Sequence, residues 1–544
     1  MLTKTIKTTS KRRISLAINK DGERVIMIDF PYDLDMIHRI RSIPGRKHHK
    51  EQTCWSVPLS KETTEKFVRW GFTIDERLEK YLNKKELKQK ELEVMTIKGL
   101  KGRLYPYQSS GVAFVDSKDG RALIADEMGL GKTIEALAWL QLHPKRRPVI
   151  IVTPAAVKIN WSRKASEWMT DPGVEILYGE KPWDPTGDIL IINYDILPKW
   201  VNKLLMMSPK VLIADECHYF KNNKAKRTKA MKKLAKFIPY FIGLSGTPIE
   251  NRPSELYNVI SIINQSLFPK FWHFAKRYCG LRHNGFGWDY SGVSNTKELH
   301  ELLTSSIMIR RLKKDVLKEL PAKTYSYVPI EIDNSKDYKS AENDFIAYIR
   351  QFKGNNAAIR AKRAQALAST EVLKQLAVKG KIDSVISWIE DFLESDQKLV
   401  VFARHRFVVN TLMEAFPNVS VKIDGSVTGD KKQETEDRFQ NDSSIRLLVG
   451  NLKAAGTGIT LTAASNVAIL EFPWTPGALS QAIDRCHRIG QKNGVVAHFL
   501  IATGTIEEKI AKLIDKKQKI LDAVMDGKIT KNEDLLMALI KHYQ

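Results

Sequence analysis

The sequence predicts an α/β protein with two parallel sheets, each flanked by helices, and a small α+β domain at the N-terminal end. Two separate regions, 149–244 and 399–500, alternate short β-rich runs with helical stretches. Such alternation is typical of a mainly parallel sheet with helices on both faces. The chain has 544 residues, which is too long for one core and suggests about three or four domains. We therefore expect two α/β lobes with helical inserts between them.

The composition is that of soluble globular domains, with 43% hydrophobic and 27% charged residues. No apolar run approaches the roughly 18 residues that a membrane span needs, so we expect no membrane association. The four cysteines form no C-x-x-C pair, which argues against a disulfide framework or a zinc cluster and for a reducing compartment. The net charge of +25 indicates a polyanionic partner, most simply nucleic acid, although a positive surface can also serve solubility alone.

Residues 1–95 are expected to form the small N-terminal domain. Within it, 24–30 and 54–58 are typical of strands and 32–43 of a short helix. A charged run at 84–93 has few large apolar residues and is expected to be a helical linker to the first lobe.

Basic residues of this domain, including Arg46 and Lys47, stand close to Trp55 in the sequence. Lysine and arginine next to an aromatic side chain would suit phosphate contacts and base stacking. A solvated loop with Trp55 in the core of the small domain explains the same residues equally well.

The stretch DEMGLGKT, 126–133, follows the apolar run 122–125 and leads into a helical stretch, 133–140. Strand, glycine turn and helix present a row of backbone N–H groups to phosphate at the helix N-terminus. The glycines let the backbone approach the phosphates, a lysine would reach the β- and γ-phosphates, and a threonine hydroxyl would hold Mg²⁺. The residues of this candidate phosphate loop are Met128, Gly129, Leu130, Gly131, Lys132 and Thr133.

The match to the phosphate-loop pattern is not strict, because G-x-x-x-x-G-K-T has glycine where this chain has Asp126. The alternative is a glycine turn before a buried helix, with Lys132 solvated. Gln108 precedes the loop by about one helix, and its carboxamide could accept from N6 of adenine and donate to N7. By itself, Gln108 would be an ordinary surface residue.

Two adjacent carboxylates, Asp215 and Glu216, follow the apolar run 211–214. A carboxylate at the end of a buried strand beside a phosphate loop holds Mg²⁺ for phosphoryl transfer. Asp215 suits the metal, and Glu216 could orient and deprotonate the attacking water. A buried pair of carboxylates without a cation would be costly. Ser245 and Thr247 follow a further apolar run and could sense the state of the γ-phosphate, although a plain turn is the alternative.

The segment 265–383 is charged, aromatic and largely helical by its pattern. Most of its charges are expected to form a solvated face. The dense basic cluster at 310–314 is a better candidate for nucleic-acid contact than the remainder.

The second alternating region has no phosphate loop but ends in QAIDRCHRIGQ, 481–491. Arg485 and Arg488 are three residues apart and are expected on one face of a helix. Their planar guanidinium groups could stabilise γ-phosphate charge across a cleft, whereas an ionic surface pair is the alternative for a lone arginine.

In their order along the chain, ten motifs resemble those of the Swi/Snf family of superfamily-two helicase-like ATPases. They are LYPYQ (104–108), DEMGLGKT (126–133), VTPAAVKINW (152–161), DECH (215–218), LSGTPIEN (244–251), RRLKKDVLKELPAK (310–323), VFARH (401–405), IDGSVTGDKK (423–432), AAGTGITLTAAS (454–465) and QAIDRCHRIGQ (481–491). Asp is usual in this family at the position of Asp126. Cys217 stands where a small Gly or Ala is usual, and Asn451 where Ser or Thr is usual.

The resemblance implies two RecA-like lobes that close on one ATP with Mg²⁺. The implied boundaries are 1–95 for the accessory domain, 96–264 for lobe 1, 265–383 for the helical protrusions and 384–544 for lobe 2. Lobe 1 would supply Lys132, Thr133, Asp215 and Glu216, with Thr133 and Asp215 on the metal, and lobe 2 would supply Arg485 and Arg488. The implied nucleotide contacts include Tyr107 and Gln108, and the implied coupling residues are Ser245, Thr247 and Gln481.

Family members track along double-stranded DNA, generally without separating its strands, and the matching segments here are 154–161 and 454–460. The implied nucleic-acid contacts are Asn160, Trp161, Lys453, Gly456 and Thr457, together with Arg46 and Lys47 in the first domain. That domain is similar to the HARP-type domain of annealing helicases through IPGR…WSVPL within 43–59.

The HARP-type likeness implies a preference for branched or forked DNA and a strand-rewinding activity, with a role in DNA repair and fork remodelling. We expect the protein to be a monomer. We expect a cytoplasmic location in a bacterial or viral host cell, or a nuclear one in a eukaryote. A strand-separating DNA or RNA helicase and a non-catalytic DNA-binding scaffold are the alternative functions.

Overall fold

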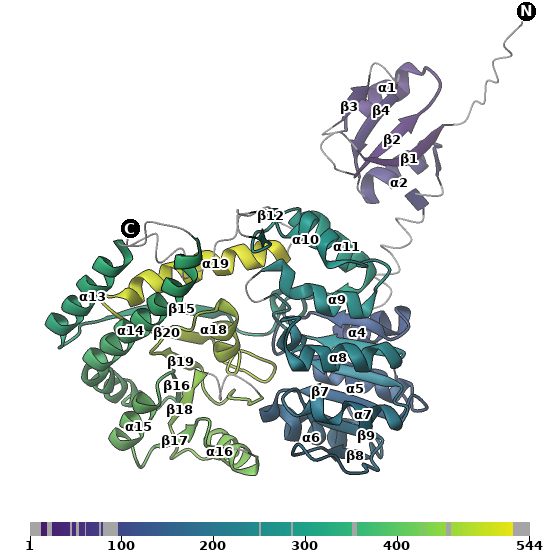
Figure 1. Cartoon of the computed structure of the whole chain (residues 1–544). Coiled ribbons are helices and arrows are strands. Elements are labelled where there is room, and N and C mark those ends of the chain that lie inside the picture. Colours follow the sequence, from purple (N-terminus) through teal and green to yellow (C-terminus); the bar gives the residue numbers. More distant parts are fainter. Residues whose placement is uncertain are drawn as a thin grey trace, which may run out of the picture. The chain divides into compact units, whose positions relative to one another are not determined.

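The computed structural model describes residues 12–18, 24–43, 46–49, 54–59, 61–75, 78–79, 96–249, 252–283, 287–350, 356–427, 429–452 and 458–525. Contacts within the chain divide it into two units, Met1–Val94 and Met95–Gln544, which are drawn in Figure 1. None of the helices in these described ranges combines the length and apolarity needed to cross a bilayer.

In its described residues, the first unit is a five-stranded sheet with helices α1 and α2. Its elements are β1 (Arg13–Ile18), β2 (Arg24–Asp29), α1 (Leu34–Arg41), β3 (Lys47–His49), β4 (Cys54–Pro58), α2 (Lys61–Arg69) and β5 (Thr73–Ile74). The strand order is β3-β4-β2-β1-β5, with antiparallel pairs except for β1 and β5. Alternate residues of β2, Ile26 and Ile28, are buried in the core with Phe67 of α2, as the alternation of side chains along a strand requires.

Lobe 1 is built on a seven-stranded parallel sheet in the order β14-β6-β11-β10-β7-β9-β8. Its strands are β6 (Arg121–Ile124), β7 (Val149–Thr153), β8 (Val174–Ile176), β9 (Ile189–Asn193), β10 (Val211–Asp215), β11 (Tyr240–Leu244) and β14 (Met308–Ile309). Its helices are α4 (Pro106–Ser117), α5 (Lys132–Leu142), α6 (Lys158–Trp168), α7 (Leu197–Met206), α8 (Lys226–Phe237) and α9 (Tyr257–Ile263), with short 3₁₀ turns η1 (Ala155–Val157), η2 (Cys217–Phe220) and η3 (Pro253–Leu256).

Both faces of the lobe 1 sheet are buried, which explains its continuous apolar strands. In β7, Ile150 and Val152 pack with α7, α8 and α9, whereas Val149 and Ile151 pack on the other face with α4, α5 and α6. In register, Leu244 of β11 pairs with both Asp215 and Ile124. The loops that follow β6, β10 and β11 therefore start at the same edge of the sheet.

Lobe 2 is built on a six-stranded parallel sheet in the order β15-β20-β19-β16-β18-β17. Its strands are β15 (Lys323–Ile330), β16 (Leu399–Ala403), β17 (Ser420–Ile423), β18 (Leu447–Asn451), β19 (Asn466–Ile469) and β20 (Val495–Ala502). Its helices are α14 (Asn356–Leu393), α15 (Arg406–Ala415), α16 (Asp430–Asn441), α18 (Pro476–Ile483) and α19 (Ile506–Met525). Helix α15 and the C-terminal half of α14 pack on one face, and α16, α18, α19 and the preceding part of α14, from Ala366 to Ala377, pack on the other. The predicted fold class, two RecA-like lobes with parallel sheets, is confirmed.

The segment 265–383 between the lobes is less uniformly helical than its sequence pattern predicts. It contains α10 (Phe271–Tyr278), α11 (Thr296–Ser306), α12 (Lys313–Val316) and α13 (Ser335–Arg350), but also the hairpin β12 (Arg282–His283) and β13 (Trp288–Asp289). It also supplies one strand to each sheet: β14 to lobe 1 and β15 to lobe 2. The predicted helical linker at 84–93 lies outside the described residues.

Candidate active site

The phosphate loop connects β6 to α5 through backbone that requires glycine. Gly129 and Gly131 have φ values of 85° and 83°, in the left-handed region that glycine adopts at little cost. A Cβ added to Gly131 would lie 2.4 Å from Nε2 of Gln108, and one added to Gly129 would lie 2.9 Å from Cβ of Arg488. The loop is thus closely packed on one side by α4 and on the other by lobe 2.

Lys132 and Thr133 open α5, both half-buried. The ammonium of Lys132 donates to the backbone carbonyls of Asp126 (2.9 Å) and Glu127 (3.4 Å). A Cβ added to Gly246 would lie 3.3 Å from the same ammonium, so the turn after β11 covers the lysine. These contacts place one positive charge in the curve of the loop, where a phosphate would need it.

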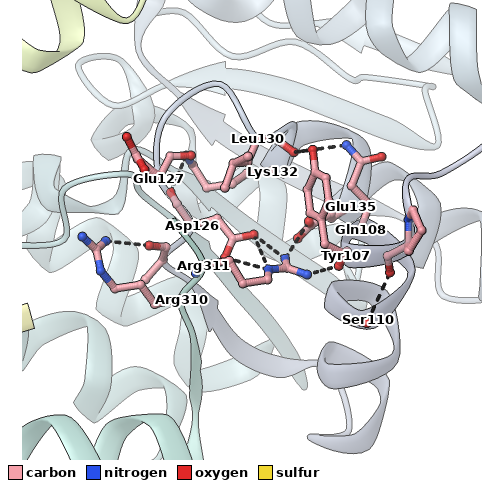
Figure 2. Close-up of polar contacts among 12 residues, drawn as sticks. Tyr107, Gln108, Ser110, Asp126, Glu127, Leu130, Lys132, Glu135, Arg310 and Arg311 are labelled. Atoms are coloured by element: carbon pink, nitrogen blue, oxygen red, sulfur yellow. Dashed lines mark hydrogen bonds and ion pairs between the residues drawn. The ribbon is translucent and has the colours of Figure 1, made fainter. Parts of the chain in front are cut away.

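Arg311 joins the phosphate loop to two neighbouring helices (Figure 2). Its Nε donates to both carboxylate oxygens of Asp126 at 3.1 and 3.0 Å, and its Nη2 donates to Oε1 of Glu135 at 2.7 Å. Its Nη1 donates to the carbonyl of Tyr107. Breaking a buried ion pair by removing one partner typically costs about 3–5 kcal/mol. Asp126 stands where the strict pattern has glycine, and its side chain anchors the phosphate loop to Arg311.

The interpretation of the basic cluster at 310–314 as a nucleic-acid surface is wrong for Arg311 and Lys313. Arg311 is held as described above, and Lys313 is buried against Asp484. Arg310 is half-buried and donates to the carbonyl of Ala125 at 2.9 Å, and its contact with nucleic acid stays a prediction. A run of positive charge in a sequence cannot reveal partners that lie far away along the chain, and here those partners are within the protein.

Tyr107 and Gln108 hold the loop from α4 (Figure 2). The Tyr107 hydroxyl and the Gln108 amide nitrogen both donate to the carbonyl of Leu130, at 3.0 and 3.1 Å. The Gln108 amide oxygen accepts from the backbone N–H of Tyr105 at 3.0 Å, and the side chain is 1% exposed. Gln108 would therefore have to break its hydrogen bonds to Leu130 and Tyr105 before it could pair with adenine. Met128 is buried in the loop and contacts the turn at Gly246.

Asp215 ends β10 as a half-buried carboxylate. Its Oδ2 accepts from the Thr153 hydroxyl and the Trp161 indole N–H, both at 2.8 Å. Burial and the charge of Glu216 raise the pKa of Asp215 to about 6, although these two hydrogen bonds oppose the shift. Trp161 is fully buried, so the predicted nucleic-acid contact of Trp161 is wrong in this structure: its side chain instead orients the carboxylate.

Glu216 adopts a left-handed backbone with φ of 47°, a strained conformation that in non-glycine residues often marks functional sites. Its Oε2 lies 3.3 Å from Nδ1 of His218 and accepts from the Ser245 hydroxyl at 3.3 Å. Burial alone would raise the pKa of Glu216, but the hydrogen bond and charge of His218, with the charges of Lys132 and Arg485, lower it to about 2. The carboxylate is thus ionised at neutral pH.

His218 lies in this site, although the sequence analysis assigned it no role. It is the last residue of the DECH motif. It lies 3.2 Å from the Ser245 hydroxyl, which in turn accepts from the backbone N–H of Thr247 at 3.2 Å. Ser245 and His218 thus connect the turn after β11 to the carboxylate of Glu216. The Thr247 hydroxyl is buried without a hydrogen-bond partner among the described residues.

Arg485 and Arg488 lie after α18, which ends at Ile483, in a succession of turns. The prediction that they share a helical face is therefore wrong. They are nevertheless close together, because Nη1 of each donates to the carbonyl of Ile459, at 3.4 and 3.3 Å. Burial and the charge of Arg485 lower the pKa of Arg488 to about 10. The Arg485 Nε is buried without a hydrogen-bond partner in the described part of the chain.

The two lobes also share a cavity of about 700 Å³ beside Glu216. It is lined on the lobe 1 side by Glu216, His218 and Tyr219 and on the lobe 2 side by Arg404 and Gln481, among others. Gln481, predicted as a coupling residue, therefore faces the same cavity as Glu216.

The predicted nucleic-acid residues are scattered. Asn160 is half-buried in α6, and Lys453, Gly456 and Thr457 lie outside the described residues. Gly458, which follows them, packs on lobe 1, because an added Cβ would lie 3.2 Å from the Ala156 carbonyl oxygen.

In the first unit, Arg46 and Lys47 are exposed at the start of β3. Trp55 is half-buried on the neighbouring strand, where it contacts the core of that unit and the ring of His48, with 4.6 Å between ring centroids. Core packing therefore accounts for Trp55, and the two basic side chains are left on the surface.

The donor set fits a nucleotide phosphate with a divalent cation. Asp215 is half-buried and accepts hydrogen bonds from two neutral groups, so an added cation would stabilise its charged form. Thr133 opens α5 next to Lys132, at a helix N-terminus that favours anions. Carboxylate and hydroxyl oxygens are the ligands that Mg²⁺ prefers.

Two family models together match residues 107–490: one described as SNF2-related domain at 107–379 and one described as helicase conserved C-terminal domain at 380–490. A Xenopus laevis protein named SWI/SNF-related matrix-associated actin-dependent regulator of chromatin subfamily A-like protein 1 is 37% identical over 427 residues, which are 77% of this chain and 44% of that protein. Its homologue in Caenorhabditis elegans is 32% identical over 96% of this chain and 77% of its own length.

A human protein named DNA annealing helicase and endonuclease ZRANB3 is 33% identical over 446 residues, covering 79% of this chain and 41% of that protein. The chain thus spans less than half the length of the Xenopus and human relatives.

Proposed function

The chain belongs to the SNF2-related family of helicase-like ATPases, and from that premise we propose that it is a DNA-dependent ATPase that translocates on duplex DNA. Its work would be to remodel branched or forked DNA or to displace bound proteins. The observation that supports this proposal most is the approach of lobe 2 to the phosphate loop: Arg488 packs on Gly129, and the charge of Arg485 acts on Glu216. Groups for hydrolysis would thus come from both lobes.

In the proposed reaction, Lys132 and the backbone of the phosphate loop bind the β- and γ-phosphates of ATP. Glu216, ionised and held by Ser245 and His218, orients the attacking water and accepts its proton. Arg485 and Arg488 stabilise the charge that develops on the transferred phosphoryl group. Mg²⁺, when bound, would be held by Thr133 and Asp215 and would neutralise charge on the phosphates.

Coupling to movement follows from the shared site. ATP would favour the closed arrangement of the lobes because it contacts both, and loss of the γ-phosphate would remove that preference. The Ser245–Thr247 turn lies between Lys132 and the start of α18, since a Cβ on Gly477 would lie 3.6 Å from Thr247. This turn and Gln481 are therefore suited to carry the γ-phosphate state to lobe 2.

DNA is the proposed partner because the chain carries a net charge of +25. The human relative is named an annealing helicase, and the alignment with the Caenorhabditis elegans relative covers 96% of this chain and so extends into the first unit. We propose that the first unit, with Arg46 and Lys47 exposed on it, gives the preference for forks.

The ATPase rate measured with different nucleic acids tests this function. We expect a low rate without nucleic acid, strong stimulation by duplex DNA, at least equal stimulation by forked DNA, and little stimulation by RNA. A strand-displacement assay on the same forks should show no net unwinding. Stimulation by RNA, or ATP-dependent separation of a duplex, would instead indicate a strand-separating helicase, and the absence of ATP hydrolysis would indicate a DNA-binding scaffold.

A further inference from the structure

Residues 310–322 connect β14 to β15 and are called the connector here. The first part of this connector lies alongside the phosphate loop. The parallel pairing of β14 with β6 continues beyond both strands, because the Ala125 N–H donates to the Ile309 carbonyl at 2.8 Å and the Glu127 N–H donates to the Arg311 carbonyl at 3.0 Å. The Glu127 carboxylate then accepts from the backbone N–H of Lys313 at 2.7 Å. Residues up to Lys313 are thus tied to the loop through the backbone.

The side chain of Lys313 reaches into lobe 2. Its ammonium donates to the carbonyl of His487 at 2.6 Å and lies 3.0 Å from Oδ1 of Asp484. The side chain is 3% exposed and that of Asp484 is 4% exposed. Both partners belong to the turn that carries Arg485 and Arg488, so Lys313 joins this turn to the phosphate loop.

The phosphate loop, Lys313 and Arg488 also meet directly. A Cβ added to Gly129 would lie 2.9 Å from Cβ of Arg488 and 3.4 Å from Cε of Lys313. The arginine-bearing turn has further supports, since Lys323 contacts Asp484 at 3.1 Å and His487 contacts the Pro321 carbonyl at 2.9 Å. Lys323 begins β15 and therefore shares a sheet with lobe 2, whereas the backbone of Lys313 is bonded to lobe 1.

We propose that Lys313 is a positioning residue for the arginine pair, which fixes the Asp484–His487 turn against the phosphate loop so that Arg485 and Arg488 face the nucleotide. Lys313 would act through the arginines and would not itself touch the nucleotide. The inference rests on the proposed function, because it assumes that the arginine pair completes the ATP site.

The variant Lys313→Met keeps the length of the side chain and removes its charge and hydrogen bonds. We expect its kcat for DNA-stimulated ATP hydrolysis to fall about 10- to 100-fold, because small misplacements of a catalytic group have effects of this size. Affinity for a fluorescent ATP analogue should stay within about twofold of the wild type, since the groups that bind phosphate on lobe 1 are intact. Lys318→Met, at an exposed lysine of the same connector, is the matched control and should keep the wild-type kcat.

A double-mutant cycle separates positioning from mere structural support. If Lys313 acts through the arginine pair, Lys313→Met should add little to the defect of Arg488→Ala, because both changes remove one shared contribution. Asp484→Asn changes the lobe 2 partner of Lys313 and weakens the same contact, so it should give the same selective loss of kcat. Thermal unfolding of each variant checks that it is folded.

Multiplying defects in the double variant, wild-type kcat in Lys313→Met, or a parallel loss of nucleotide affinity would overturn the inference while leaving the proposed function standing. Wild-type kcat in Arg488→Ala would overturn the inference together with the proposed role of the arginine pair.

Discussion

Arg488→Ala should lower the turnover of DNA-stimulated ATP hydrolysis by about 10³- to 10⁵-fold, the range that arginine fingers contribute in phosphoryl transfer. The expectation follows from position: Arg488 is half-buried and packs against Gly129 of the phosphate loop, in surroundings where a guanidinium stabilises developing charge more strongly than it would in water. ATP should still bind, because Lys132 and the loop backbone remain. Steady-state hydrolysis together with titration of a fluorescent ATP analogue separates these two effects.

Arg438→Ala is the control for Arg488→Ala, because Arg438 is an exposed arginine of α16 in the same lobe. Its turnover should match the wild type. Wild-type turnover in Arg488→Ala itself would remove Arg488 from the mechanism.

Glu216→Gln should abolish most turnover, by about 10²- to 10⁴-fold, the usual contribution of a general base. Glutamine keeps the shape of the side chain and can still accept from the Ser245 hydroxyl, but it cannot take a proton from water. Binding of ATP and of DNA should persist, so the variant is expected to remain on DNA with ATP bound. Single-turnover hydrolysis and a DNA mobility-shift assay measure the two properties.

Glu180→Gln, at an exposed glutamate of lobe 1, controls for the loss of one negative charge and should hydrolyse ATP at the wild-type rate. An unchanged single-turnover rate in Glu216→Gln would remove Glu216 from the mechanism.

The central strands of both lobes could be predicted to within one or two residues because they are buried on both faces. The apolar runs ILIIN, 189–193, and LVVF, 399–402, correspond to β9 and β16, for example. Strand β15 was missed because it is an edge strand in which exposed and half-buried residues alternate, which gives a polar texture. Strand β14 has two residues and leaves no periodicity to detect.

Local pattern identified the phosphate loop and the acidic pair, since each follows a buried strand directly. It could not identify the partners of Arg311, because Asp126 and Glu135 stand 185 and 176 residues away. The burial of Trp161 could not be predicted from local pattern either. An aromatic residue in a basic helix can stack on a base or, as here, donate a hydrogen bond to Asp215. The roles of Arg311 and Trp161 thus depend on contacts with residues far away in the sequence, which local pattern does not reveal.

The central claim is that hydrolysis at a site shared by two lobes moves the protein along duplex DNA. Displacement of a third strand from a triplex tests it most directly, because release of that strand requires movement along the duplex without separation of its strands. The account predicts ATP-dependent release by the wild type and none by Glu216→Gln. Rapid DNA-stimulated hydrolysis by the wild type with the third strand left in place would contradict it.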